Sequence, residues 1–322
     1  KELLNAVLRT KFKTLATVGN LNNHIGVPLT LLALNQSHEL AIVEMGANKQ
    51  GDIQELCEIA EPTHGFITNI GKAHLEGMGG PEGVLKTKTE LYQHLRENKG
   101  TVFINSQDPI LSNMIKRFEE PVLYPAKGDF CEVSFHGADP FVKFSVEGNQ
   151  EIFLSSLIGA YNFGNIATAL TVGKFFGVDM NQAVQAIVDY KPSNMRSQLV
   201  EKRSNLIILD AYNANPTSMK AALENLEAIP TKNKIAILGD MFEVGNTSAE
   251  EHQIIINLLE KLEFSNMMVC GKNFYQTSTQ EVLKFENFED LKNYIQRNNF
   301  EDATILIKGS RGMALERILE VL

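Results

Sequence analysis

Residues 39–70 read ELAIVEMGANKQGDIQELCEIAEPTHGFITNI, and this stretch alternates between two kinds of local structure. An apolar run over Glu39–Glu44 is followed by a segment from Ile53 to Ala60 whose apolar residues recur at helical spacing. A second apolar run covers Gly65–Ile70. Strand, helix and strand in this order, separated by short polar turns, are typical of a unit that builds a parallel sheet. We therefore predict an α/β fold.

The same alternation continues beyond residue 70. A helix is predicted over Val84–Leu95 and a strand over Thr101–Asn105. From residue 123 to about residue 157 the apolar runs become short and alternate with polar residues, as in Phe141–Val146 and Glu151–Leu154. This pattern favours antiparallel strands joined by a tight turn. We predict a small antiparallel extension on a parallel-sheet domain.

A second domain follows a short polar connection. Two helices are predicted over Asn162–Phe176 and Asn181–Asp189, and the segment Tyr190–Asn194, which contains a proline, comes after them. We place the domain boundary there, giving domains of residues 1–194 and 195–322. The alternation then restarts, so the second domain is predicted to be a smaller doubly wound α/β domain of Rossmann type. Its predicted strands are Asn205–Asp210, Lys234–Leu238, Asn266–Cys270 and Ala303–Ile307.

Composition and charge exclude several classes of protein. The chain has 322 residues, 43% hydrophobic and 21% charged, which is the balance of a soluble globular protein. A net charge of -9 argues against nonspecific nucleic-acid binding and against binding to an anionic membrane surface. No apolar run approaches about 18 to 20 residues, so membrane insertion is not predicted. Three cysteines without CxxC spacing favour a reducing cytoplasm.

The first residues already have helical spacing. Leu3, Leu4, Val7 and Leu8 would share one face, and no capping residue precedes them. We therefore expect the chain to begin inside a helix, with a further segment upstream.

Polar residues follow several predicted strands, where ligands bind in open α/β sheets. Glu44 ends an apolar run, so its carboxylate would be partly buried and would need a cation or hydrogen-bond donors. A divalent metal is one such partner. His74 would be an unusual ligand for Mg²⁺, which prefers oxygen, and a histidine also fits satisfied packing or a softer metal. Helix capping is the alternative explanation for each single position. Comparable positions are occupied by Asn69, Asn105, Asp108, Asp210, Asp240 and Lys308.

Two further groups of residues point to ligands. Asn162 and Asn165 lie three residues apart at the start of a predicted helix and would share one face, where two amides could read a base or a ribose. Lys308 and Arg311 lie between a strand and a predicted helix, a position that fits an anion site and a solvated loop with two surface cations equally well. From the residues alone, the chain is a two-domain α/β protein that binds a nucleotide or another anion. The reaction type stays open.

Eight segments, taken in their order along nearly the whole chain, resemble the Mur ligases. Each segment alone is a weak signal, and the ordered set is specific. The resemblance implies a central parallel-sheet ATPase domain of the P-loop type with an antiparallel extension, a C-terminal Rossmann-like domain, and a monomer. The segments are Gly19–Pro28, Glu44–Ala47, Thr68–Gly77, Lys86–Leu91, Tyr161–Asn165, Asp210–Pro216, Leu238–Gly245 and Ile307–Arg311.

Within the family, the chain most resembles the members that add D-alanyl-D-alanine during peptidoglycan synthesis. The resemblance implies that the terminal carboxylate of a UDP-N-acetylmuramoyl-tripeptide attacks the γ-phosphate of ATP, and that the amine of D-alanyl-D-alanine captures the acyl phosphate. Glu44 and His74 match the family's magnesium ligands. Lys88 matches a lysine that is carbamylated to hold a second Mg²⁺, and Lys86 is the rival assignment.

The resemblance also implies nucleotide and substrate contacts. Asn162 and Asn165 match residues on the adenine side, and Arg196 and Asp210 match contacts to phosphate and ribose. Asn22 and Asn23 are expected to face the UDP-linked peptide. The residues expected near the dipeptide, with two cations suited to its carboxylate, are Asn213, Asn215, Glu243, Lys308, Ser310 and Arg311.

The chain departs from the family pattern at its start and at two single positions. This sequence contains neither the family's glycine-rich phosphate loop ending Gly-Lys-Thr-Thr nor the preceding uridine-binding domain. Because that loop holds the phosphates, we expect these 322 residues alone neither to hydrolyse ATP nor to ligate. Tyr161 stands where relatives often have histidine, and Leu209 stands where an aspartate often precedes the one that matches Asp210.

Three alternatives remain to be weighed. A Mur ligase that adds the third peptide residue and a folylpolyglutamate synthetase share the superfamily, but Asp210–Pro216 and Asn20–Asn23 favour the dipeptide-adding members. A noncatalytic binding module would not need Glu44, His74 and Lys88 together. A nicotinamide-dependent oxidoreductase would carry a GxGxxG motif after a strand, and no predicted strand here is followed by one.

Overall fold

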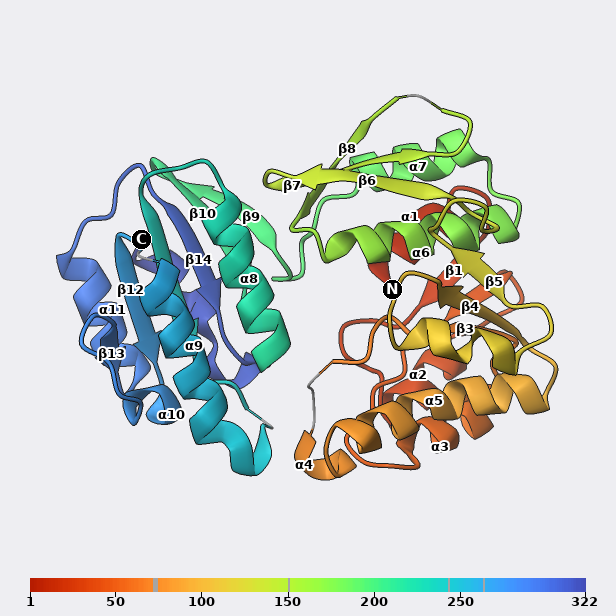
Figure 1. Ribbon diagram of the computed structural model, residues 1–322, viewed down its shortest axis with the longest axis horizontal. Coiled ribbons are helices and arrows are strands. Elements are labelled where there is room, and N and C mark those ends of the chain that lie inside the picture. Colours follow the sequence, from red (N-terminus) through yellow and green to blue (C-terminus); the bar gives the residue numbers. More distant parts are fainter. Residues whose placement is uncertain (72–74, 150, 243, 263) are drawn as a thin grey trace. The chain divides into compact units, whose positions relative to one another are not determined.

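The computed structural model describes residues 1–322 apart from residues 72–74, 150, 243 and 263 (Figure 1). Contacts along the backbone divide the chain into two compact units. Unit 1 comprises Lys1–Ser156 and Ala160–Tyr190, and unit 2 comprises Leu157–Gly159 and Lys191–Leu322. The domain boundary after residue 194 stays a prediction. In the division by contacts, unit 1 ends at Tyr190 and unit 2 resumes at Lys191.

Unit 1 contains the predicted parallel strands in short form. Strand β1 (Thr14–Ala16) pairs with β2 (Leu40–Ile42) in parallel. A second parallel sheet has the order β3 (His64–Phe66), β4 (Thr101–Asn105) and β5 (Val122–Tyr124). Strand β2 ends before Glu44, earlier than predicted, because the Glu44 N–H donates to the Thr17 hydroxyl instead of to a strand carbonyl.

Helices cover these strands, and an antiparallel sheet extends the unit (Figure 1). Helix α1 (Glu2–Leu8) buries the four apolar residues predicted from spacing and packs against α6 and α7. Strands β6 (Val133–Ala138), β7 (Phe141–Val146) and β8 (Phe153–Ile158) form the predicted extension, in which β6 and β7 are antiparallel. The other helices are α2 (Gly26–Leu32), α3 (Asp52–Ala60), α4 (Leu75–Met78), α5 (Pro81–Glu97), the 3₁₀ helix η1 (Leu111–Arg117), α6 (Asn162–Phe175) and α7 (Met180–Asp189).

Unit 2 is one six-stranded sheet with the order β13-β12-β11-β14-β10-β9. Only the β9–β10 pair is antiparallel among the described strand pairs of this sheet. Every residue of the central strand β14 is buried, as expected for a parallel strand covered on both faces. The strands are β9 (Gln198–Lys202), β10 (Asn205–Asp210), β11 (Lys234–Gly239), β12 (Asn266–Cys270), β13 (Leu283–Phe285) and β14 (Thr304–Lys308).

Helices and buried apolar residues complete unit 2. Its core includes Ile207, Ile237, Met268 and Ile305 from four neighbouring strands, together with Leu291 from α11. The α-helices are α8 (Pro216–Ala228), α9 (Ser248–Leu262), α10 (Lys272–Tyr275) and α11 (Phe288–Arg297), and the 3₁₀ helices are η2 (Gly245–Thr247), η3 (Arg311–Met313) and η4 (Leu315–Glu320). The fold of both units is therefore α/β, as predicted.

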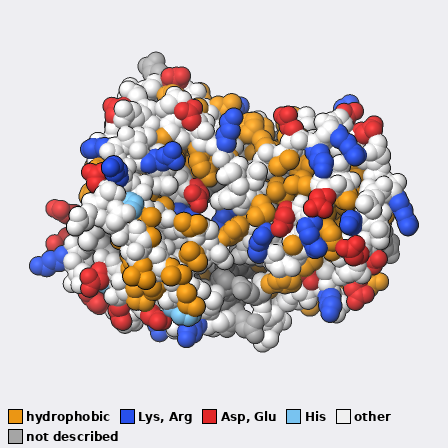
Figure 2. Space-filling model, turned by 180° about the vertical axis from the view of Figure 1, so that it is seen from behind, with side chains coloured by type: hydrophobic (Ala, Val, Ile, Leu, Met, Phe, Trp, Pro, Cys, Tyr) orange, Lys and Arg blue, Asp and Glu red, His pale blue; other side chains and the backbone are white. Residues whose placement is uncertain are grey.

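The surface agrees with the acidic composition. The face drawn in Figure 2 carries Lys and Arg side chains interspersed with Asp and Glu, rather than a continuous basic area among the described residues. A search of the described part of the chain finds no helix both long and apolar enough to span a bilayer.

Candidate active site

In unit 1, the loops after β1 and β2 are joined through Glu44. Its Oε1 accepts a hydrogen bond of 2.8 Å from Asn22 Nδ2, and the Asn22 carbonyl accepts one of 2.7 Å from the Gly46 N–H. A Cβ added to Gly46 would lie 2.8 Å from Asn22 Nδ2, so a larger residue at position 46 would push the Asn22 amide away from its place beside Glu44. Glu44 and Asn22, predicted in separate roles, therefore act as one pair.

A lysine partly neutralises this carboxylate. Lys1 Nζ lies 3.6 Å from Glu44 Oε2 and donates to the carbonyls of Thr17 (2.9 Å) and Gly19 (2.8 Å). The Glu44 side chain keeps 28% of its surface exposed. A carboxylate held in this way has its charge balanced and still has an open side.

Asn23 is used differently from Asn22. Its Oδ1 accepts hydrogen bonds from the N–H groups of Ile25 (3.1 Å) and Gly26 (2.9 Å) at the start of α2. These are donors that a helix start leaves unsatisfied. The substrate contact predicted for Asn23 stays a prediction, and in this structure the side-chain oxygen is bonded to the backbone.

Lys88 and Lys86 lie on α5 in contrasting surroundings. Lys88 Nζ donates a 2.7 Å hydrogen bond to the carbonyl of Asn69, in the loop after β3. Burial lowers the pKa of Lys88, because desolvation disfavours the charged amine. Lys86 is exposed to solvent. Lys88 therefore takes its neutral, nucleophilic form at a lower pH than an ordinary lysine does.

Two predicted site residues, His74 and Glu243, lie outside the described residues. Within the described part of the chain, no group of three or more His, Cys, Asp and Glu side chains could hold a metal ion. The predicted magnesium ligands are thus represented here by Glu44 and Lys88.

At the start of α6, Asn162 and Asn165 share one face, as predicted. Asn165 Nδ2 donates a 3.0 Å hydrogen bond to Asn162 Oδ1. Asn162 is buried, whereas Asn165 and the preceding Tyr161 are exposed. The hydrogen bond to the buried Asn162 amide therefore orients the exposed amide of Asn165.

In unit 2, Asp210 and Lys308 end neighbouring strands and form a buried ion pair. They are register partners in β10 and β14, and Lys308 Nζ lies 2.7 Å from Asp210 Oδ2. Lys308 also donates 3.0 Å to the Asn213 carbonyl, and Asp210 Oδ1 accepts 3.2 Å from the Ser197 N–H. Lys308 is only 1% exposed, so the interpretation of a solvated loop with two surface cations is wrong for this residue.

The side chains of Arg311 and Arg196 are more exposed than that of Lys308. The Arg311 side chain is 56% exposed and pairs with Glu316 at 2.7 Å. The helix predicted after it is only the 3₁₀ turn η3, which is too short for the helix N-terminal anion site that was one of the two interpretations of this segment. Arg196 stacks on Tyr212, with its guanidinium carbon 4.1 Å from the ring centroid. Its neighbours Met195 and Ser197 both have positive φ angles, a strained backbone of the kind found at functional sites.

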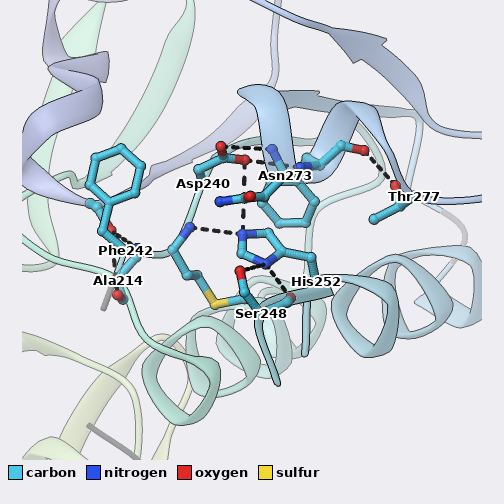
Figure 3. Close-up of polar contacts among 10 residues, drawn as sticks. Ala214, Asp240, Phe242, Ser248, His252, Asn273 and Thr277 are labelled. Atoms are coloured by element: carbon cyan, nitrogen blue, oxygen red, sulfur yellow. Dashed lines mark hydrogen bonds and ion pairs between the residues drawn. The ribbon is translucent and has the colours of Figure 1, made fainter. Parts of the chain in front are cut away.

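The remaining candidates near the predicted dipeptide are bonded to the backbone. Asn215 caps α8 in a reciprocal capping box with Ser218. Asn213 Oδ1 accepts from the Ala214 N–H at 2.8 Å. Ser310 is buried, and its Oγ accepts 2.8 Å from the Phe242 N–H and donates to the Ala214 carbonyl at 3.5 Å (Figure 3). Their predicted substrate contacts stay predictions.

Sequence reasoning missed His252, which lies on α9 beside Asp240. It is fully buried and bonded to the loop after β11. A lone histidine on an apolar helix face carries no sequence signal that separates it from an ordinary core residue.

Two family models match the chain. The Mur ligase middle domain matches residues 1–173, and the Mur ligase glutamate ligase domain matches residues 195–311.

Two curated proteins similar to the chain share one name. The UDP-N-acetylmuramoyl-tripeptide–D-alanyl-D-alanine ligase of Bacillus subtilis is 31% identical over 330 residues, covering 99% of this chain and 72% of that protein. The protein of the same name from Escherichia coli is 31% identical, covering 100% of this chain and 74% of that protein.

Solved structures agree. The chain matches MurF of Acinetobacter baumannii with a TM-score of 0.87 at 28% identity, covering 99% of this chain and 72% of that one. It matches the MurF ligase of Thermotoga maritima, solved in complex with ADP, with a TM-score of 0.85 at 27% identity, covering 100% and 75%.

Proposed function

This chain belongs to the Mur ligase family, and on that basis we propose that it joins D-alanyl-D-alanine to UDP-N-acetylmuramoyl-tripeptide with ATP as the energy source. It is a peptide ligase of peptidoglycan synthesis. The observation that carries the proposal is the match over nearly the whole chain to relatives of that name. The other ligases of the superfamily and a noncatalytic binding module are not favoured, since the relatives that share 31% identity with this chain all but end to end are named for the dipeptide-adding ligase.

The proposed reaction has two steps. A carboxylate oxygen of the tripeptide attacks the γ-phosphorus of ATP, the bond to the β-phosphate oxygen breaks, and ADP leaves. The amine of D-alanyl-D-alanine then attacks the acyl carbon, phosphate leaves, and the amine loses a proton. Both steps concentrate negative charge on phosphate oxygens, so positioning and charge neutralisation are what the protein must supply.

The residues described in unit 1 suit Mg²⁺. Glu44 offers a carboxylate with an open side, and Asn22 holds its other oxygen in place. Hard oxygen ligands are those that Mg²⁺ prefers. Bound Mg²⁺ would neutralise the charge that develops on the transferred phosphoryl group. We propose two such sites, held by Glu44, His74 and carbamylated Lys88.

Carbamylation of Lys88 is supported by its surroundings. The neutral Nζ would attack the carbon of CO₂, form an N–C bond and release one proton, which converts a cation into an oxygen ligand. Because burial lowers the pKa of Lys88, the neutral amine needed for this step is more accessible than at an exposed lysine. This contrast favours Lys88 over Lys86.

We propose that the remaining candidates divide between nucleotide and peptide. Asn162 with Asn165 reads the adenine, while Arg196 and Asp210 contact phosphate and ribose. Arg311 is the cation best suited to the dipeptide carboxylate, because its exposed pair with Glu316 is worth only about 0–1 kcal/mol and can be exchanged. Lys308 serves mainly as the partner of Asp210. Peptide-side contacts are proposed for Asn22, Asn23, Asn213, Asn215, Glu243 and Ser310.

The cellular setting follows from the cysteines. Cys57, Cys131 and Cys270 are buried as free thiols, and burial raises the pKa of each. Free thiols suit a reducing compartment, so we propose a cytoplasmic enzyme. The family resemblance implies that it acts as a monomer.

The proposal is tested with the protein at its full natural length. Phosphate release is measured with ATP, Mg²⁺ and UDP-N-acetylmuramoyl-tripeptide, with and without D-alanyl-D-alanine, and the product is weighed by mass spectrometry. Release that requires the dipeptide and yields the pentapeptide is expected. Phosphate release that instead requires a folate with glutamate, or UDP-N-acetylmuramoyl-dipeptide with a single amino acid, would assign the chain to another ligase of the superfamily.

A further inference from the structure

His252 is a fully buried titratable group that the proposed reaction does not use. It lies on α9 with no exposed surface. Its Nε2 accepts a 3.0 Å hydrogen bond from the Met241 N–H, and its Nδ1 lies 2.7 Å from the Ser248 carbonyl oxygen (Figure 3). A backbone N–H can only donate and a carbonyl can only accept. The two contacts together therefore place the single ring proton on Nδ1.

The charges around the ring are consistent with this neutral form. Asp240 Oδ1 lies 3.8 Å from Nε2, but this carboxylate already accepts bonds of 2.9 Å from the N–H groups of Asn273 and Phe274. The Phe274 ring packs edge-on against the imidazole, at 4.6 Å between centroids. Burial is the largest influence on the pKa of His252 and lowers it. The hydrogen bond to the Ser248 carbonyl and the negative charges of Asp240 and Glu251 act in the opposite direction and raise the pKa. The ring is thus an acceptor toward the loop after β11.

This acceptor is the first link of a continuous series of bonds. Met241 N–H is held by His252, and the next amide, Phe242 N–H, is held by Ser310 Oγ. Ser310 in turn contacts the Ala214 carbonyl in the loop after β10, and its own N–H donates to the Asp240 carbonyl at 3.2 Å. Three loops at the carboxyl edge of the sheet are fixed to one another in this way (Figure 3).

We propose that His252 is a positioning residue that, through its Nε2 acceptor, fixes the Met241–Phe242 turn and with it the orientation of Ser310 beside the dipeptide site. The residue touches no reacting atom, since it is fully buried. This inference rests on the proposed function of the same site. It adds the residue that holds the loop geometry on which binding of the dipeptide depends.

The alternative is that His252 only fills space in the core. Two substitutions separate the explanations. In His252→Gln the side-chain oxygen can take the place of Nε2 and accept from Met241. In His252→Asn the shorter amide can take the place of Nδ1–H and donate to Ser248, which leaves the Met241 N–H without an acceptor. Both remove the ring, so a space-filling role predicts similar effects.

The first test needs no ligation assay. In ¹⁵N-labelled chain, we expect nuclear magnetic resonance to place the His252 proton on Nδ1, and the Met241 amide to exchange with solvent slowly in the wild type and in His252→Gln. In His252→Asn that amide should exchange about tenfold faster or more, because a buried donor that has lost its acceptor opens to solvent more readily. A proton on Nε2 in the wild type would overturn the proposal even if neither variant folds.

The second test separates binding of the dipeptide from binding of ATP in the protein at its full natural length. KM for D-alanyl-D-alanine should rise about tenfold in His252→Asn and recover to within about threefold of wild type in His252→Gln, while KM for ATP changes by about twofold or less. His136→Asn, the same change at an exposed histidine, should leave both constants unaltered. Equal effects of Asn and Gln on the two KM values would overturn the positioning role. If the wild type does not ligate at all, the proposed function fails and the exchange measurements still decide the role of His252.

Discussion

The carboxyl edges of the sheets carry polar side chains in both units, but the two edges are built differently. In unit 1, Glu44 keeps an open side and Lys88 is bonded to the single carbonyl of Asn69. In unit 2, Lys308 is 1% exposed and bonded to Asp210 and Asn213, and Ser310 is buried among three loops. Side chains that must take up a new partner during a reaction need either an open side, as at Glu44, or few bonds to exchange, as at Lys88. Those of unit 2 instead hold loops in place.

The largest effect on ligation that this difference between the units predicts is at Lys88. Lys88→Ala should reduce ligation by about a hundredfold or more while hardly changing the unfolding temperature, because the residue acts on the charge of the reaction. Added bicarbonate should not restore activity, since the amine that would react with CO₂ is gone. Phosphate release and thermal unfolding are measured in parallel.

Lys86→Ala is the matched control on the same helix, and should keep nearly full activity. If Lys86→Ala loses activity and Lys88→Ala retains it, the assignment of the carbamylated lysine is reversed, and the burial of Lys88 has no catalytic meaning.

At Lys308 we expect the main effect of substitution to be on stability. Lys308→Ala leaves the Asp210 carboxylate buried without its partner, which should cost about 3–5 kcal/mol in the free energy of unfolding. The double variant Asp210→Asn, Lys308→Met should recover much of that loss, because it removes the unpaired charge as well. Urea titration of the three proteins measures both effects. A loss below about 1 kcal/mol in the single variant would mean that this edge is not the rigid frame described here.

The contrast between the units also explains what could be predicted from the sequence. Strands Thr101–Asn105, Asn205–Asp210 and Asn266–Cys270 have the predicted bounds, because apolar runs ended by polar residues are a local signal. The pairing of Asp210 with Lys308 could not be predicted, since it depends on the register of two strands distant in the sequence.

The same limit applies to side-chain roles. Asn22 and Asn23 are neighbours of the same type, yet one bonds Glu44 and the other caps α2. Which of them faces a ligand depends on where the loop after β1 turns, and composition does not carry that information. His252 was missed for a related reason, because its function as an acceptor is visible only once the Met241 N–H is placed.

A smaller effect should follow from removing a cap in unit 2. Asn215→Ala breaks the capping box of α8 and should lower the free energy of unfolding by about 1 kcal/mol, with Asn215→Gly costing less. If Asn215 serves mainly as a frame residue, KM for the dipeptide should change only in proportion to the lost stability. A rise in KM of about tenfold or more at unchanged stability would instead place its amide on the substrate, as the family resemblance implies.

The smallest effect we expect is a pH dependence of stability that belongs to His252. Burial holds its pKa in the folded chain below the ordinary value of 6.5, so as the pH falls below 6.5 the unfolded state takes up a proton that the folded state does not. Stability should therefore fall with falling pH from 6.5 down to the folded pKa, and change no further below it. His64, whose pKa burial also lowers, adds a similar contribution from unit 1, so the wild type alone cannot isolate the effect. The slope of stability against pH between about pH 7 and pH 5 should be shallower in His252→Gln than in the wild type, and shallower again when His64→Gln is added. An unchanged slope in His252→Gln would mean that folding does not lower the pKa of His252, so that the ring takes up a proton in the folded chain below pH 6.5 as it does in the unfolded chain. A ring protonated in this way could not accept the Met241 N–H that holds the loops of unit 2 together.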